Sequence, residues 1–66
     1  MKNVEMILKR NLSFDSLYVT NIGRYQNKYI YRLDTKTQQI AEFSSQYGNC
    51  LDALLEWFDQ ESMSHD

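Results

Sequence analysis

The chain has 66 residues, with nine Asp and Glu against seven Lys and Arg, and a formal net charge of −2. This length allows one domain over residues 1–66 with one small core, and a single cysteine excludes an internal disulfide. No apolar run approaches the roughly 20 residues that span a bilayer, so we expect a cytoplasmic protein with no membrane contact.

Residues 1–13 have a pattern that fits two structures. Val4, Ile7 and Leu8 share one helical face, whereas Val4, Met6 and Leu8 alternate as they would in a strand. Several good helix formers occur here and favour a short helix, but the strand remains open.

The first two strands are predicted between residues 17 and 33. Residues 17–20 are β-branched and aromatic, and residues 21–23 have the composition of a turn. Residues 28–33 form the clearest strand, with Tyr29, Tyr31 and Leu33 on one face.

A third strand is predicted at residues 38–43, after a polar turn at 34–37. Ala41 and Phe43 share one face of it. Connections this short join antiparallel neighbours, so the three strands form a meander. Residues 44–48 are expected to form a loop.

A C-terminal helix is predicted from Cys50 to residue 60 or 62, with Asn49 as its N-cap and Asp52 in its first turn. Its apolar stripe is expected to cover the sheet and consists of Leu51, Leu54, Leu55 and Phe58. The predicted fold class is therefore α+β: a three-stranded antiparallel β-meander with one C-terminal α-helix packed on it and an N-terminal segment of either type.

The sequence does not favour an enzyme. The only histidine, His65, lies in a tail, residues 63–66, that is expected to fray. Cys50 has no histidine near it and is predicted to be a half-buried residue at the start of the helix. We therefore expect no catalytic residue, no metal site and no cofactor.

The charges are distributed unevenly along the chain. Residues 1–41 hold all seven Lys and Arg against three carboxylates, a net charge of +4, whereas residues 42–66 hold six carboxylates and no Lys or Arg, a net charge of −6. Such asymmetry points to interaction with charged partners.

The predicted helix carries most of the acid. Asp52, Glu56 and Asp59 line one flank, where like charges four residues apart destabilise a helix and no Lys or Arg on the helix relieves them. They either solvate an exposed face or, together with Glu61, dock on a basic partner. Trp57 stands on the opposite flank; the sequence favours burial for it, and if exposed it would be an interface anchor.

A second candidate surface is the outer face of the sheet. Cations interleaved with tyrosines can contact phosphates and stack on bases, and the candidate nucleic-acid-binding residues are Tyr18, Arg24, Lys28 and Arg32. These cations are few, and an acidic chain argues against this alternative. The basic and acidic sides could also pair with each other in a homodimer.

The sequence thus predicts a small non-enzymatic protein-interaction module, a regulator or inhibitor. Its partner-binding residues are Asp52, Glu56, Asp59, Glu61 and Trp57, which would dock on a protein with a basic surface. The alternative is the sheet-based nucleic-acid binder. A short chain without disulfides is typical of phage or mobile-element accessory proteins, which is a hypothesis about origin.

Overall fold

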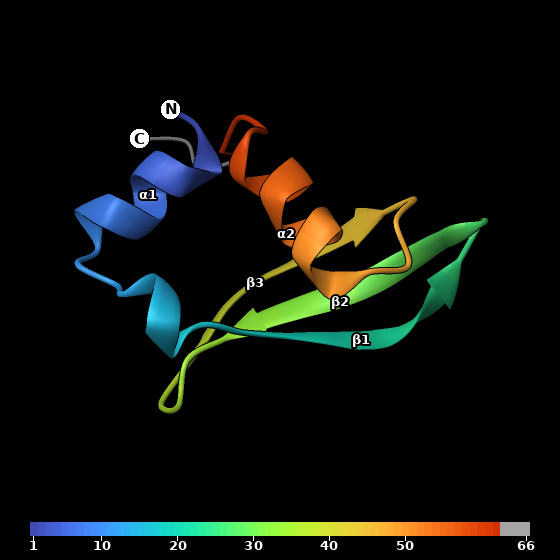
Figure 1. The fold of residues 1–66 in the computed structure, drawn as a ribbon, viewed down its shortest axis with the longest axis horizontal. Coiled ribbons are helices and arrows are strands. Elements are labelled where there is room, and N and C mark those ends of the chain that lie inside the picture. The colour runs from blue at the N-terminus through green and yellow to red at the C-terminus, as the bar shows by residue number, and fades with distance from the viewer. Residues whose placement is uncertain (63–66) are drawn as a thin grey trace.

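The computed structural model describes residues 1–62 and confirms the α+β class (Figure 1). The predicted tail, residues 63–66, lies outside the described residues. The elements follow the chain in this order: α1 (Asn3–Lys9), the 3-10 helix η1 (Phe14–Ser16), β1 (Tyr18–Tyr25), β2 (Lys28–Asp34), β3 (Gln39–Ser45) and α2 (Cys50–Phe58). The N-terminal segment is thus a short helix, the alternative that its residue types favoured.

The three strands form an antiparallel sheet in the order β1-β2-β3, as predicted, with β2 in the centre. The turn predicted at residues 21–23 is wrong. Those residues continue β1 through a bulge between Asn21 and Gly23, and the chain reverses at Gln26 and Asn27. Both turn residues have positive φ, 51° and 67°, which is the backbone of the two-residue turn that suits twisted strands.

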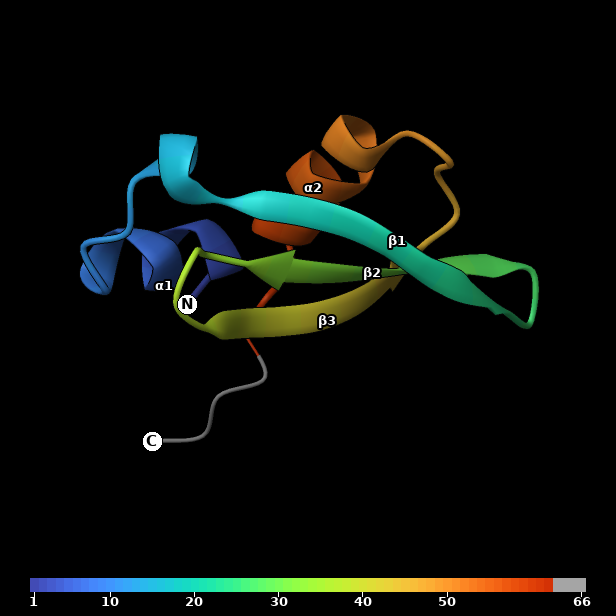
Figure 2. The same ribbon diagram turned by 90° about the horizontal axis from the view of Figure 1, so that it is seen from below.

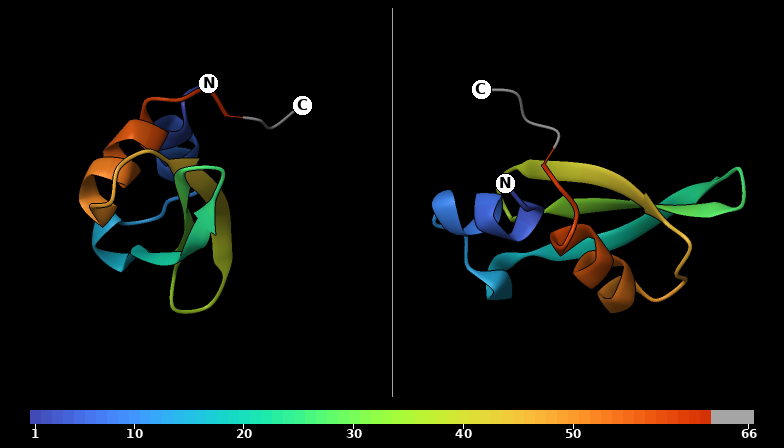
Figure 3. Two further views of the ribbon diagram at one scale, coloured as in Figure 1. Left: turned by 90° about the vertical axis from the view of Figure 1, so that its right-hand side faces the viewer. Right: turned by 90° about the horizontal axis from the view of Figure 1, so that it is seen from above.

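The register separates two faces of the sheet. Tyr31 pairs with Phe43 and Leu33 with Ala41, and these side chains lie toward α2. β3 extends to Ser45, two residues beyond the predicted strand, because Ser44 and Ser45 still pair with Ile30 and Tyr29. Figures 2 and 3 show α2 on one face of the sheet and the other face uncovered.

The core is a column of aromatic rings between the sheet and α2. Trp57 stacks on Phe43 at 5.4 Å between ring centroids, and Phe43 stacks on Tyr31 at 5.6 Å. Leu33, Ile7 and Ala53 complete the buried set. Such pairs contribute beyond the area that they bury, and they connect strands and helix in a domain with room for few core residues.

The two ends of the described chain lie side by side (Figure 1). Lys2 and Glu61 form an antiparallel bridge, the Asn3 N–H donates to the Gln60 carbonyl at 2.9 Å, and the Ser62 N–H donates to the Met1 carbonyl at 2.7 Å. We call this pairing the terminal clasp. It holds α1 against the C-terminal end of α2.

None of the helices in residues 1–62 has the length and apolar character that crossing a bilayer requires.

Candidate functional site

α2 packs on the sheet through a different face from the one predicted. Ala53 is fully buried and Trp57 is 7% exposed, whereas Leu51 and Leu55 are 62% and 54% exposed. The expectation that the four-residue apolar stripe covers the sheet is therefore wrong for Leu51 and Leu55, whereas Leu54 and Phe58 are half-buried and pack against the core. The aromatic ring of Trp57 stacks on Phe43 and selects the buried face, and the small side chain of Ala53 allows the helix to approach the strands.

The exposed leucines form one wall of an apolar groove. It has a volume of about 450 Å³ and is lined entirely by apolar residues: Phe14, Leu17, Leu51, Leu54, Leu55 and Phe58. Phe14 on η1 is 49% exposed and contacts the Phe58 ring at 5.5 Å between centroids. Exposed apolar side chains that line one groove, unlike apolar residues scattered singly over a surface, are candidates for a binding site.

An acidic hollow lies on the other side of Leu55. Its volume is about 500 Å³ and its lining residues are Tyr47, Asp52, Leu55, Glu56 and Asp59. Leu55 lines both hollows. We call the apolar groove and this acidic flank together the α2 surface. The sequence identified its carboxylates but not the groove beside them.

Three of the predicted acidic residues have partners within the chain. The Ser45 hydroxyl donates to Glu56 at 2.8 Å, the Lys2 ammonium pairs with Asp59 at 2.6 Å, and the N-terminal ammonium pairs with Glu61 at 2.9 Å. Lys2 thus relieves part of the repulsion on α2 from outside the helix. Asp52 is exposed and forms no ion pair within residues 1–62.

The two ion pairs that accompany the terminal clasp, Lys2 with Asp59 and the N-terminal ammonium with Glu61, shift pKa values in opposite directions. The hydrogen bond and charge of Asp59 raise the pKa of Lys2 above its ordinary value. The hydrogen bond and charge of the N-terminal ammonium lower the pKa of Glu61. Both groups are exposed, so each ion pair contributes little to the stability of the fold.

Trp57 lies in the core, as the sequence favoured. Its backbone carbonyl accepts a hydrogen bond from the Asn3 side chain at 2.8 Å, and its ring lies between Phe43 and Phe58. It therefore supports the α2 surface from below and does not offer an exposed anchor.

The candidate nucleic-acid residues are not all on one face. The register places Tyr18 and Arg32 on the uncovered face, whereas Arg24 lies over the Tyr29 ring at 5.0 Å on the side of α2. Arg32 also pairs with Asp34 at 2.9 Å. Glu42 lies opposite Arg32 on β3 and adds a second carboxylate, whereas Lys28 pairs with Tyr25 and has no carboxylate opposite it in the register.

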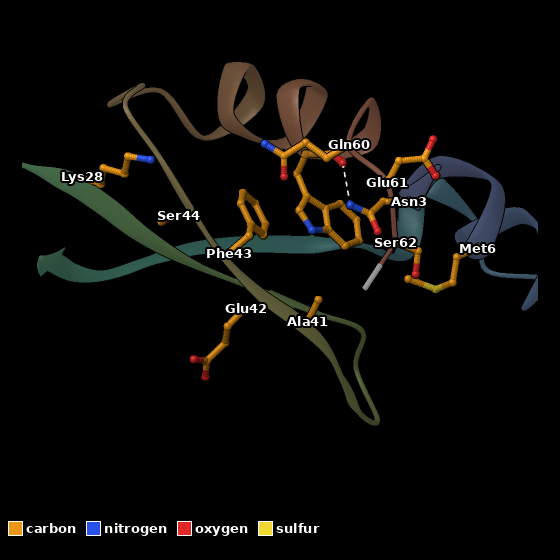
Figure 4. A pocket seen from close by; sticks show the side chains of 11 residues that line it. Asn3, Met6, Lys28, Ala41, Glu42, Phe43, Ser44, Gln60, Glu61 and Ser62 are labelled. Atoms are coloured by element: carbon orange, nitrogen blue, oxygen red, sulfur yellow. Dashed lines mark hydrogen bonds between the residues drawn. The ribbon is translucent and has the colours of Figure 1, made fainter. Parts of the chain in front are cut away.

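A third hollow of about 450 Å³ lies between β3 and the chain ends (Figure 4). Both polar and apolar residues line it, including Asn3, Trp57 and Glu61. Within residues 1–62, every buried side-chain nitrogen and oxygen has a hydrogen-bond partner, so no polar group in this hollow requires a ligand.

Residues 1–62 contain no cluster of His, Cys, Asp and Glu that could hold a metal ion. Cys50, the first residue of α2, is exposed, contrary to the half-buried position predicted for it.

The chain matches no family model, and comparisons with curated proteins and with solved structures give no match either.

Proposed function

We propose that this protein is a small non-enzymatic protein-interaction module, a regulator or inhibitor that acts by covering a surface of a larger partner with α2. The observation that carries the proposal is the exposure of Leu51 and Leu55 over a groove lined only by apolar residues. The exposed part of each of these two side chains leaves about 1–2 kcal/mol of burial unused, which a partner can recover on binding.

The contact differs from one made by charge alone. Asp59 and Glu61 already have cationic partners in the terminal clasp, and Glu56 accepts from Ser45. The carboxylates that border the groove can steer a basic partner toward it and increase the association rate. The apolar groove then supplies most of the affinity.

The test uses matched variants as bait. Purified wild-type protein, a Leu51→Ser/Leu55→Ser double variant and a Tyr25→Ser control are used to capture partners from the source cells. Tyr25 is 67% exposed and sits at the end of the β1–β2 hairpin, far from η1 (Figure 1). Each captured protein is then purified and titrated against the three baits.

The proposal expects a protein that forms a complex with the wild type and with Tyr25→Ser, and binds at least about tenfold more weakly to the double variant. Circular dichroism first establishes that the double variant is folded. Equal binding of all three baits to every purified candidate would refute the proposed role of α2.

Nucleic-acid binding remains the competing proposal and has less support. Arg24 lies on the opposite side of the sheet from Arg32, and Arg32 pairs with Asp34. A mobility-shift assay with mixed DNA and RNA at low salt decides between the two. A shift that Lys28→Ala/Arg32→Ala removes and Leu51→Ser/Leu55→Ser leaves intact would favour the sheet.

A further inference from the structure

We propose that the part of the partner that enters the apolar groove is a basic amphipathic helical segment. Its apolar residues fill the groove, and Lys or Arg residues along one flank meet the carboxylates of α2. This inference rests on the proposed function and specifies the chemistry of the partner.

The arrangement of side chains around α2 supports this match. At about 100° per residue, Leu55 lies about 180° from the midpoint between Ala53 and Trp57, so the most outward position of the helix is apolar. Asp59 and Asp52 follow Leu55 on one side. On the other side lie the half-buried residues that line the groove, Leu54 and Phe58. A ligand along α2 therefore meets carboxylates on one flank and apolar side chains on the other.

The spacing along the axis sets the length of the ligand. Asp52 and Asp59 are seven residues apart, about 10 Å or two helical turns. Leu51 and Leu55 lie four residues apart: Leu51 directly precedes this span and Leu55 lies within it. A helix of three turns with apolar residues at i, i+3 or i+4, and i+7 matches this pattern, and cations on the neighbouring stripe lie within reach of both carboxylates.

Charge argues against other occupants. An acidic segment or an anionic membrane would be repelled by the acidic flank, where Asp52 forms no ion pair within residues 1–62. A second copy of the chain offers the basic helix α1, but Ile7 is buried and Leu8 is the large apolar residue that α1 exposes. A single leucine does not fill a two-turn groove.

The experiment measures three labelled peptides of about 14 residues by fluorescence anisotropy, against the intact protein. The first has leucines at helical spacing and lysines on one flank. The second has the same leucines with glutamates in place of the lysines. The third keeps the lysines and replaces the leucines with serines.

The first peptide should bind at least about tenfold more tightly than either of the others, and salt should reduce its advantage over the second. Leu55→Ser should weaken binding of the first peptide about tenfold or more. Asp52→Lys should weaken it several-fold and strengthen binding of the second. Glu42→Lys is the matched control: it makes the same charge change on the uncovered face of the sheet and should have a smaller effect.

Four results would overturn the inference. Equal binding of both leucine peptides would show that the ligand does not need basic residues, while leaving the proposed function intact. Absence of any binding that depends on Leu55 would exclude a helical ligand in the groove. A dimer in sedimentation that Leu55→Ser dissociates would show that a second copy fills it. Binding to anionic vesicles that Leu55→Ser abolishes would assign the groove to a membrane.

Discussion

Two separate variants of α2, Trp57→Ala and Leu55→Ala, test which face of the helix stabilises the fold. Trp57 is 7% exposed and stacks on Phe43 at 5.4 Å, so its removal leaves a cavity and ends the ring contact. Core Trp→Ala changes cost about 3–5 kcal/mol. A domain of this size has a total stability of about the same magnitude, so Trp57→Ala should be largely unfolded in buffer.

Leu55 gives the opposite expectation. Its side chain is 54% exposed, so truncation removes about half of the burial of a leucine and leaves no enclosed cavity, a loss of about 1 kcal/mol. The milder Trp57→Phe keeps a ring against Phe43 and should cost about 1–2 kcal/mol, which keeps the comparison measurable if Trp57→Ala does not fold.

Urea unfolding followed by far-UV circular dichroism measures all three variants without depending on the tryptophan signal. The expected order of stability is wild type, Leu55→Ala, Trp57→Phe, Trp57→Ala. A Leu55→Ala variant that loses as much stability as Trp57→Ala would refute the packing of α2 described above, and with it the apolar groove.

Three further changes have defined outcomes. Tyr31→Phe removes the hydroxyl that donates to the Tyr47 carbonyl at 2.6 Å and should cost about 1 kcal/mol in urea unfolding; no loss would mean that water replaces the donor. Asn49→Ala removes the side-chain oxygen that caps the first turn of α2 and should also cost about 1 kcal/mol, whereas Asn49→Asp should retain most of the stability. The lowered pKa of Glu61 means that its ion pair stabilises the terminal clasp fully above the ordinary glutamate pKa, and that this stabilisation is lost as pH falls through the lowered pKa. The backbone N–H of Asn3, whose exchange rate is corrected for the intrinsic effect of pH, should then lose protection from hydrogen exchange. Glu61→Gln should abolish that pH dependence. An identical pH profile in the variant would assign the dependence to another group.

Local chemistry identified most of the fold. Asn49 caps α2 as predicted, because its side chain accepts from two backbone N–H groups in the first turn. The alternation of Tyr29, Tyr31 and Leu33 correctly gave the inner face of β2. Short polar connections required an antiparallel meander, and the structure has one.

The errors arose where tertiary contacts outweigh local signals. The 21–23 segment has turn composition, but a bulge accommodates Gly23 within β1. The leucines of α2 form the wider apolar stripe, yet Trp57 faces the sheet because the column of aromatic rings is available only once Tyr31 and Phe43 have been brought together by strand pairing. Periodicity alone does not include the surface against which a helix packs.

Only the part of the candidate site that depends on local sequence could be predicted. The carboxylates of α2 are visible in the sequence, since their spacing places them on one flank. Their partners were not, because Lys2 lies 57 residues from Asp59 along the chain. The apolar groove also combines α2 with Phe14 and Leu17, which only the folded chain brings together.

The terminal clasp has a consequence for the order in which the molecule folds and opens. The two hairpins of the sheet close from residues that are near in sequence, whereas pairing Lys2 with Glu61 requires almost the whole chain to be in place. Its ion pairs are exposed and it joins the two ends of the described chain, so this joint is expected to open on its own while the sheet stays intact. Asn3 holds the backbone of Trp57, and release of the joint would uncover part of that ring. The single tryptophan of the chain is therefore a built-in fluorescent reporter of whether the two ends are joined.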